Sequence, residues 1–496
     1  MFRRILIANR GEIAVRVIRA CRELGVESVA VYSDVDAGAL HVSLADRTVR
    51  IGPAPPALSY LSANAVLAAA RDTGAEAIHP GYGFLSEDHT FAAACAVAGV
   101  AFVGPPADVI ARMGSKISAR QLASQAGVSV VPGETPVDQS DDAVAAAACR
   151  LGLPALIKPS EGGGGIGIKR VRDAASLLAA IGQARREALA AFGDGTLFVE
   201  RLIERGRHVE IQILADHHGQ VVHLFERECS LQRRHQKIVE ETPSTAVTPR
   251  LRGRMGEAAS AVARAAGYRN AGTVEFLVEG SGDKALFYFL EMNTRLQVEH
   301  PVTEQTTGVD LVAAQIRIAA GEPLPWSQAQ LLQRGHAIEV RLYAEDPARD
   351  DLPQAGPLLL YREPSMPGLR VDAGVAEGDE VPVYYDPMLA KLIAWGDTRE
   401  DARRRAVAGL RGYPILGVRT NVPFLIGLLD HPAFVSGDID TGFVDAERRT
   451  LVARLGGDPP PDALAVAAHA GESMLPDAPR SIVASDPWTT LRGWRG

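Results

Sequence analysis

Residues 291–300 combine side chains that could hold a metal ion and bind an oxyanion. They read Glu-Met-Asn-Thr-Arg-Leu-Gln-Val-Glu-His and follow an uncharged apolar run, 286–290, that predicts a β-strand. Because alternate side chains of a strand share a face, Glu291, Asn293 and Arg295 are expected to project together. A carboxylate, an amide oxygen and a cation on one face can hold a divalent metal and the oxyanions that it bridges. Burying this set without a ligand would be costly, which favours a binding site over solvated charges on an edge strand.

Four consecutive glycines, residues 162–165, form a second candidate site between two predicted apolar strands, the first at 155–158. Glycine lets backbone N–H groups approach an anion closely, so the run predicts a mobile loop over an anionic ligand. A flexible linker is the alternative. The run lies inside a hairpin-like pattern rather than between domains, which favours the loop.

The N-terminal part of the chain predicts alternating strands and helices that could position such groups. A strand at 5–8 precedes a helix with apolar residues at helical spacing up to Leu24, and Gly25 is placed to end it. Further strands are predicted at 29–32, 77–80 and 100–103. This alternation indicates a doubly wound parallel sheet covered on both faces. The first loop lacks Gly-x-Gly-x-x-Gly, so no dinucleotide site is expected there.

The middle of the chain predicts a different kind of sheet. Mostly alternating apolar and polar residues indicate antiparallel strands at 209–214, 221–225, 273–278 and 286–290. Short strands and a helix follow residue 341, and from Gly456 the composition turns to Pro, Ala, Gly and Asp, as in a linker or tail. We therefore expect an α/β and α+β chain in five parts, at 1–114, 115–203, 204–332, 333–446 and 447–496.

Composition limits the functional classes. The chain has 496 residues, 47% of them apolar and 23% charged, with a net charge of −8, so a general nucleic-acid binder is not expected. The four cysteines show no Cys-x-x-Cys spacing, which fits reduced thiols in the cytoplasm better than disulfides or a zinc site. The N-terminal apolar run is too short for a signal peptide, and no apolar stretch approaches the ~18 residues that span a bilayer.

Several long motifs together resemble one family. Residues 7–14, 79–87, 227–237 and 291–300 are similar to biotin carboxylase, the ATP-grasp component of the acyl-CoA carboxylases and pyruvate carboxylase. The resemblance covers about residues 2–445, in order. It implies a Rossmann-like N-terminal domain (the pre-ATP-grasp sheet), an ATP-grasp linker and lid, an ATP-grasp core with the metal and bicarbonate site, and a C-terminal biotin carboxylase domain.

The resemblance implies a two-step reaction with ATP, Mg²⁺ or Mn²⁺, and biotin. ATP phosphorylates bicarbonate to carboxyphosphate, which then carboxylates a ureido nitrogen of biotin. Glu275 and Glu291 would hold the metal, with Asn293 in support. Lys116 and Lys158 would pair with phosphates. The full set implied to bind ATP is Lys116, Lys158, Gly162, Gly163, Gly164, Gly165, Gly167, Glu200, Ile203, His208, Gln232 and His235, with Glu200 and the Ile203 backbone at the adenine and His208 at the ribose or phosphates.

The resemblance also implies how the small substrates are handled. Glu299 would be the base that takes the bicarbonate proton, Arg341 would stabilise the enolate-like oxygen of biotin, and Tyr82 would line the biotin pocket. Bicarbonate would be held by Lys237, Arg295, Gln297 and the backbone of Val298. Lys237 and Arg295 thus join Glu299 and Arg341 as catalytic candidates. The basic run 233–237 is then an anion site rather than a nucleic-acid patch.

The glycine-rich loop departs from the family pattern. The family usually has Lys or Arg at the position of Ile166 and Met at that of Ile168. Losing a cation over the phosphates should weaken ATP capture, although Lys169 remains. We expect activity with a raised KM for ATP, and an unchanged KM in Ile166→Lys would contradict the role of this charge.

Partners follow from what the chain contains. It has no Met-Lys-Met biotin-attachment site, and residues 486–495 resemble the stretch that precedes the carrier region in longer acyl-CoA carboxylase α chains. We expect a chain that ends just before its carrier, or a truncated one, with biotin supplied free or on a carrier domain or protein. A separate carboxyltransferase would select the acyl-CoA. In the family the helix bearing Arg16, Arg19 and Glu23 takes part in a two-fold dimer interface, which implies a homodimer, although the stripe could be a solvated helix face.

Two other functions are compatible with these motifs. One is a different bicarbonate-phosphorylating ATP-grasp ligase, similar to carbamoyl-phosphate synthase. Arg341 and Tyr82 argue against it, because they serve a ureido group. The other is a non-catalytic nucleotide-binding subunit, given Ile166 and Ile168 in the loop. A biotin-stimulated, bicarbonate-dependent ATPase activity would separate all three.

Overall fold

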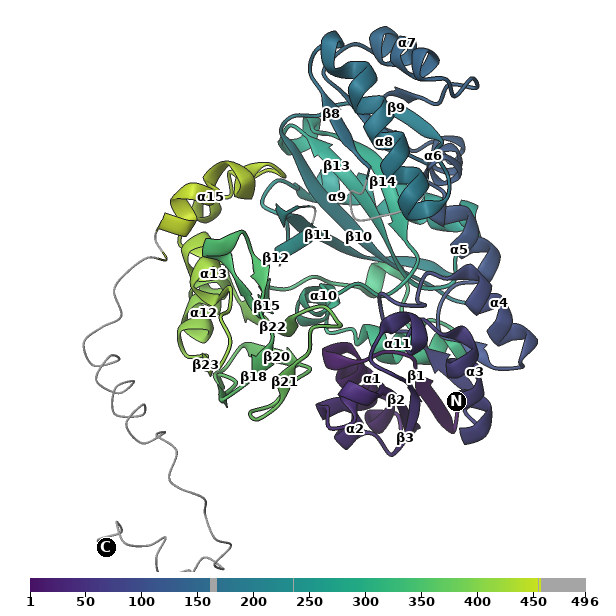
Figure 1. Cartoon of the computed structure of the whole chain (residues 1–496), viewed down its shortest axis with the longest axis vertical. Helices are drawn as coiled ribbons and strands as arrows, with labels where there is room; N and C mark the ends of the chain where they lie inside the picture. The colour runs from purple at the N-terminus through teal and green to yellow at the C-terminus, as the bar shows by residue number, and fades with distance from the viewer. Residues whose placement is uncertain (161–166, 235, 454, 456–496) are drawn as a thin grey trace, which may run out of the picture. The chain divides into compact units, whose positions relative to one another are not determined.

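The N-terminal residues form the predicted parallel sheet in the computed structural model, which describes residues 1–160, 167–234, 236–453 and 455. The strand order is β3-β2-β1-β4-β5, and every neighbouring pair is parallel. The strands are β1 Arg4–Ile7, β2 Glu27–Ser33, β3 Arg47–Gly52, β4 Ala77–His79 and β5 Ala101–Phe102. The helices that alternate with them are α1 Gly11–Glu23, α2 Leu40–Leu44, α3 Ala63–Thr73 and α4 His89–Val97 (Figure 1).

Both faces of this sheet are covered, as predicted for a doubly wound fold. Ile5 and Ile7 of β1 pack in one apolar cluster with residues of α1, whereas Leu6 packs in a second cluster with residues of α3 and α4. Alternate β1 side chains therefore enter opposite cores. The buried strand β1 fixes the position of the polar loop that follows it, in which Asn9 and Arg10 line a cavity described below.

A small antiparallel sheet follows in the order β6-β9-β7-β8. Its strands are β6 Gly133–Glu134, β7 Ala155–Pro159, β8 Lys169–Val171 and β9 Leu197–Arg201, and the helices of this region are α5 Ala107–Gly114, α6 Lys116–Gln125, α7 Asp141–Leu151 and α8 Leu177–Phe192. β7 and β8 pair as the predicted hairpin. Gly162, Gly163, Gly164, Gly165 and Ile166, which join them, lie outside the described residues.

A large antiparallel sheet runs through the rest of the chain in the order β14-β13-β10-β11-β12-β15-β22-β20. Its strands are β10 Gly206–Ala215, β11 Val221–Arg233, β12 Gln236–Thr242, β13 Asn270–Glu279, β14 Leu286–Asn293, β15 His336–Tyr343, β20 Leu369–Ala373 and β22 Met388–Gly396. The four predicted strands are confirmed as β10, β11, β13 and β14. β12 was not predicted from the sequence, and it pairs with β15 through Val239 and Val340. The sheet is therefore continuous across the expected boundary at 332.

Helices cover this sheet, and short strands border it. The helices are α9 Pro249–Ala266, α10 His300–Thr307, α11 Leu311–Ala319, α12 Arg399–Arg411, α13 Val422–Leu429, α14 Pro432–Ser436 and α15 Phe443–Ala453. The short strands are β16 Glu345–Asp346, β17 Leu352–Pro353, β18 Gly356–Pro357, β19 Leu360–Tyr361, β21 Glu380–Val381 and β23 Ile415–Leu416. α15 extends the folded part beyond the expected start of the tail at 447, and its Leu451 is buried.

Two further observations concern the chain as a whole. It divides into one unit at Met1–Val452 and a second at Ala453–Gly496, which lies almost entirely outside the described residues, as do 486–495. In the part that the structure describes, no helix is both long and apolar enough to cross a membrane.

Candidate active site

Lys237 lies at the centre of a buried cluster of carboxylates. Its Nζ lies 2.6 Å from Glu210 Oε2, 2.9 Å from Glu275 Oε1 and 2.7 Å from Glu299 Oε1. These contacts use all three N–H donors of the ammonium group. Burial would lower the pKa of Lys237, but the three carboxylates hold it well above its usual value. The cation therefore stays charged, and β10, β12 and β13 meet at it.

Arg227 supports this cluster from within the sheet. It is fully buried on β11 and donates to Glu210 Oε1 at 2.5 Å and to Gln297 Oε1 at 2.7 Å. Gln297, a predicted bicarbonate ligand, is thereby oriented, and its Nε2 donates to Glu275 Oε1 at 3.0 Å. No role was predicted from the sequence for Arg227 or Glu210, although Arg227 opens one of the motifs that carry the resemblance. The signal that could have identified them is an arginine within a strand motif together with an acid on a neighbouring strand, because a buried arginine needs a paired acid.

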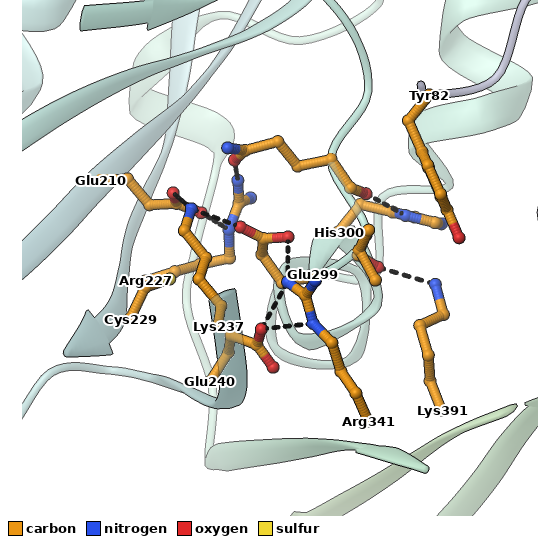
Figure 2. Close-up of polar contacts among 12 residues, drawn as sticks. Tyr82, Glu210, Arg227, Cys229, Lys237, Glu240, Glu299, His300, Arg341 and Lys391 are labelled. Atoms are coloured by element: carbon orange, nitrogen blue, oxygen red, sulfur yellow. Dashed lines mark hydrogen bonds and ion pairs between the residues drawn. The ribbon is translucent and has the colours of Figure 1, made fainter. Parts of the chain in front are cut away.

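Glu299 lies between Lys237 and Arg341 (Figure 2). Arg341 Nη2 is 2.9 Å from Glu299 Oε2, and Arg341 Nε donates to Glu240 Oε1 at 2.7 Å. Burial would raise the pKa of Glu299, but Lys237, Arg341 and Arg227 hold it well below its usual range. Burial raises the pKa of Glu240 to about 7, with Arg341 opposing and Glu299 adding to the shift. The predicted base is therefore ionised, beside a second acid that was not predicted from the sequence.

The predicted metal ligands come together on neighbouring strands. Glu275 of β13 faces Glu291 of β14, and a bulge next to this pair changes the register so that Phe276 faces Phe289. Asn293 Nδ2 donates to Glu275 Oε1 at 2.8 Å, and His208 Nε2 lies 3.1 Å from Glu275 Oε2. Burial and then Glu275 raise the pKa of Glu291. A buried acid, Glu275, and a half-buried one, Glu291, opposite each other on paired strands fit a divalent cation between them.

A cavity of about 430 Å³ gathers the predicted nucleotide and bicarbonate residues. Its lining includes Lys116, Lys158, His208, Gln232, Lys237, Glu275, Glu291, Asn293, Arg295, Gln297, Val298 and Glu299, together with Ile168 and Arg341. Glu200 and Ile203 do not line this cavity. Glu200 lies behind Lys158, with Oε2 3.0 Å from Nζ, and Ile203 is buried. Gly167 adopts a positive φ of 77°, whereas His235 lies outside the described residues.

A second cavity, of about 660 Å³, adjoins the first. Gln236, Arg295, Val298 and Arg341 line both cavities, so these residues form their junction. The second cavity also contains Tyr82, Phe84, Tyr343, Tyr384 and Tyr385, and its aromatic walls suit a small organic ring. The Tyr82 hydroxyl donates to Glu12. Tyr82 thus lies in a chamber separate from the metal ligands, with Arg341 reaching both.

The cations of the basic run 233–237 have different ion-pair partners, and its interpretation as an anion site stays a prediction. Arg233 is buried in a bidentate pair with Glu345, at 2.6 and 2.7 Å. Arg234 pairs with the exposed Asp350. Lys237 alone among these three cations pairs with the acids of the site. Arg234 and Lys237 nevertheless line the same cavity, together with Gln232 and Gln236.

Comparison with known proteins decides the family. Residues 1–110 match the biotin carboxylase N-terminal domain, and residues 339–446 match the biotin carboxylase C-terminal domain. Residues 115–327 match the ATP-binding domain of the carbamoyl-phosphate synthase L chain. A biotin carboxylase of Halalkalibacterium halodurans is 50% identical over 444 residues, which are 90% of this chain and 97% of that protein. The chain belongs to the biotin carboxylase family.

Other relatives are subunits or domains of larger carboxylases. The mitochondrial methylcrotonoyl-CoA carboxylase subunit alpha of Oryza sativa is 51% identical over 451 residues, but the chain spans only 61% of its length. The biotin carboxylase domain of Hydrogenobacter thermophilus 2-oxoglutarate carboxylase, solved as a dimer with MgADP, ADP and bicarbonate, is 43% identical. It has a TM-score of 0.87 and covers 91% of this chain and 99% of its own. The predicted fold and the ligase class are confirmed, and the flanking family domains disfavour the carbamoyl-phosphate synthase alternative.

Proposed function

We propose that this biotin carboxylase uses ATP and bicarbonate to carboxylate biotin presented by a carrier, as the first half-reaction of an acyl-CoA carboxylase. One observation carries the assignment of roles. Lys237, Glu299 and Arg341 form a continuous ion-paired chain where the two cavities meet. Arg341 lines both chambers, and its partner Glu299, the proton acceptor, lines the chamber suited to nucleotide and bicarbonate.

In the first step, Lys237, Arg295, Gln297 and the Val298 N–H would hold bicarbonate by converging donors. The ionised Glu299 accepts the hydroxyl proton as a bicarbonate oxygen attacks the γ-phosphorus of ATP. A phosphorus–oxygen bond to ADP breaks as the new one forms, which yields carboxyphosphate. Lys116 and Lys158, both lining the same cavity, would neutralise phosphate oxygens.

The metal that this step needs fits the residues present. Glu275 and Glu291 face each other on paired strands, and with the amide oxygen of Asn293 they would supply hard oxygen ligands to a divalent cation. Bound Mg²⁺ or Mn²⁺ would neutralise charge on the ATP phosphates. His208, 3.1 Å from Glu275, would hold the orientation of that carboxylate.

In the second step, the bond between the carboxyl carbon and the phosphate oxygen of carboxyphosphate would break, the released phosphate would take the ureido N–H proton, and the ureido nitrogen would bond to the carboxyl carbon. Arg341 would donate to the ureido oxygen of biotin during this transfer. Arginine remains protonated and presents a fixed fork of donors, which suits a developing oxyanion. Tyr82, whose hydroxyl is anchored on Glu12, would form the wall of the pocket.

The partners belong to the same proposal. Biotin would arrive on a carrier domain or protein, a separate carboxyltransferase would select the acyl-CoA, and the chain would form a homodimer. We place this reaction in the cytoplasm, since Cys21, Cys95, Cys149 and Cys229 are free thiols.

The test of the proposed function measures ADP and carboxybiotin formation with purified protein, MgATP, bicarbonate and free biotin. ATP hydrolysis that neither requires bicarbonate nor rises with biotin would reject the proposal.

A further inference from the structure

Two buried side chains hold the backbone on either side of Val298. His300 Nδ1 lies 2.8 Å from the carbonyl oxygen of Gln297, and Lys391 Nζ lies 2.7 Å from the carbonyl oxygen of Val298. His300 and Lys391 are both 0% exposed. Figure 2 shows them on the opposite side of Glu299 from Lys237. His300 and Lys391 thus donate hydrogen bonds to the carbonyl groups of two consecutive peptide units.

The first contact sets the direction of the Val298 N–H. A carbonyl oxygen can only accept, so His300 Nδ1 carries the proton. His300 Nε2 has no hydrogen-bond partner among the described residues, and burial holds the pKa of this imidazole well below its usual value. In a planar trans peptide the C=O and N–H groups point in opposite directions. With the Gln297 carbonyl turned to His300, the Val298 N–H points away from His300.

The second contact sets the next peptide unit, which carries Glu299. Lys391 lies on β22 and reaches Val298 from the C-terminal family domain. Its Nζ is also 3.3 Å from Glu12 Oε1, which accepts from Tyr82 at the aromatic chamber. Gly374 permits this close approach, because a Cβ there would lie 2.3 Å from the Glu12 backbone nitrogen. Residues from three family domains therefore converge on one short backbone segment.

We propose that His300 and Lys391 are positioning residues that aim the Val298 N–H and the Glu299 carboxylate at bicarbonate. Neither side chain lines either cavity, so both act through the backbone that they hold. The inference rests on the proposed function, because it takes the ligand beside Val298 to be bicarbonate. It predicts a defect in bicarbonate use without an equal defect in ATP use.

Matched variants of His300 separate positioning from packing. In His300→Asn the side-chain amide nitrogen takes the place of Nδ1, so it can still donate to the Gln297 carbonyl. In His300→Gln the amide nitrogen takes the place of Nε2, which has no hydrogen-bond partner among the described residues. We expect His300→Gln to raise the KM for bicarbonate at least about tenfold, with the KM for ATP within about twofold, and His300→Asn to restore most of the loss. Equal behaviour of the two folded variants would overturn the role of His300.

Lys391→Met removes the other donor and should raise the KM for bicarbonate by a similar factor. The double variant Glu12→Gln/Lys391→Met also removes the carboxylate that pairs with Lys391, so it carries the test if the single variant does not fold. The control is Arg252→Met/Glu226→Gln, which removes a partly buried ion pair between α9 and β11. The control should lower Tm and leave the KM for bicarbonate unchanged.

A wild-type KM for bicarbonate in folded Lys391 variants would overturn this inference alone. Absence of bicarbonate-dependent ATP cleavage by the wild type would instead overturn the proposed function.

Discussion

Arg341 Nη2 and Glu299 Oε2 lie 2.9 Å apart, so the proposed oxyanion donor and the proposed base form one buried ion pair. Each keeps the other charged. Glu299 retains a low pKa partly because of Arg341, and the pKa of Arg341 is raised well above its usual value by Glu240 and Glu299 against the cost of burial. Substituting either partner leaves the other buried and uncompensated. Variants at this pair must therefore be measured in both half-reactions.

Glu299→Gln should abolish proton acceptance and lower bicarbonate-dependent ATP cleavage by roughly 10²–10⁴-fold. Nucleotide affinity should change little, because Glu299 contacts Lys237 and Arg341, which are proposed to bind bicarbonate and biotin rather than the nucleotide. Steady-state ADP release and nucleotide titration measure the two effects. Glu279→Gln, at an ion pair with Arg201, is the matched control. A Glu299→Gln enzyme with wild-type turnover would remove Glu299 from the reaction.

Arg341→Ala should slow carboxybiotin formation by about 10²–10³-fold, the usual effect of losing a donor to an oxyanion. ATP cleavage without biotin should persist at a reduced rate, since the metal ligands stay in place. Labelled bicarbonate incorporation, read beside ADP release, gives the ratio of the two steps. Arg341→Lys retains the charge without the fork and should lie between Ala and wild type. An unchanged ratio in Arg341→Ala would contradict this role.

Glu240 predicts a pH dependence of stability. Its pKa rises from 4.5 to about 7 on folding, so between these values the folded state binds more protons than the unfolded chain. Its contribution to the free energy of unfolding therefore falls as pH rises from about 4.5 to 7. Glu299 acts in a different window, because its lowered pKa contributes stability that is lost only as pH falls below its unfolded value.

Glu240→Gln should remove this pH-dependent contribution to the free energy of unfolding. Thermal scans at several pH values should show a smaller decrease in Tm between pH 5 and 7 than in the wild type. The amide oxygen of the substituted side chain can still accept from Arg341, which limits the loss of packing. A wild-type pH profile in the variant would show that Glu240 does not titrate in this range.

Arg19→Glu tests the expected homodimer. Arg16 does not belong to a solvated stripe, as the sequence also allowed, because it is buried in ion pairs with Glu304 and Asp310. The Arg19 side chain is 47% exposed, 3.9 Å from Asp372, and remains available to a partner. Charge reversal should raise the dimer dissociation constant at least about tenfold in sedimentation equilibrium. Arg71→Glu, on the exposed side of α3, is the control and should leave the dimer dissociation constant unchanged. An unchanged dissociation constant in Arg19→Glu would show that the dimer uses another surface.

The local parts of the site could be predicted from the sequence. The 291–300 segment and the strand before it were recognisable because residue type and strand spacing carry the signal, and the parallel sheet followed from alternating apolar segments. Lys237 was predicted only from the resemblance to the family. β12 was missed because Lys237, Glu240 and Glu241 interrupt its apolar pattern. Those charges are buried only because partners from β10, β15 and α12 neutralise them.

The sequence by itself determined the family and the order of its family domains, and it predicted most of the side chains that are proposed to perform the chemistry. Only the tertiary structure decided which of those groups touch. The Glu299–Arg341 pair, the Glu240 carboxylate and the hold of Lys391 on Val298 join segments far apart in the chain. The physical reason is that local pattern encodes burial and periodicity, whereas the register of the large sheet and the packing of three domains set the distances between charges.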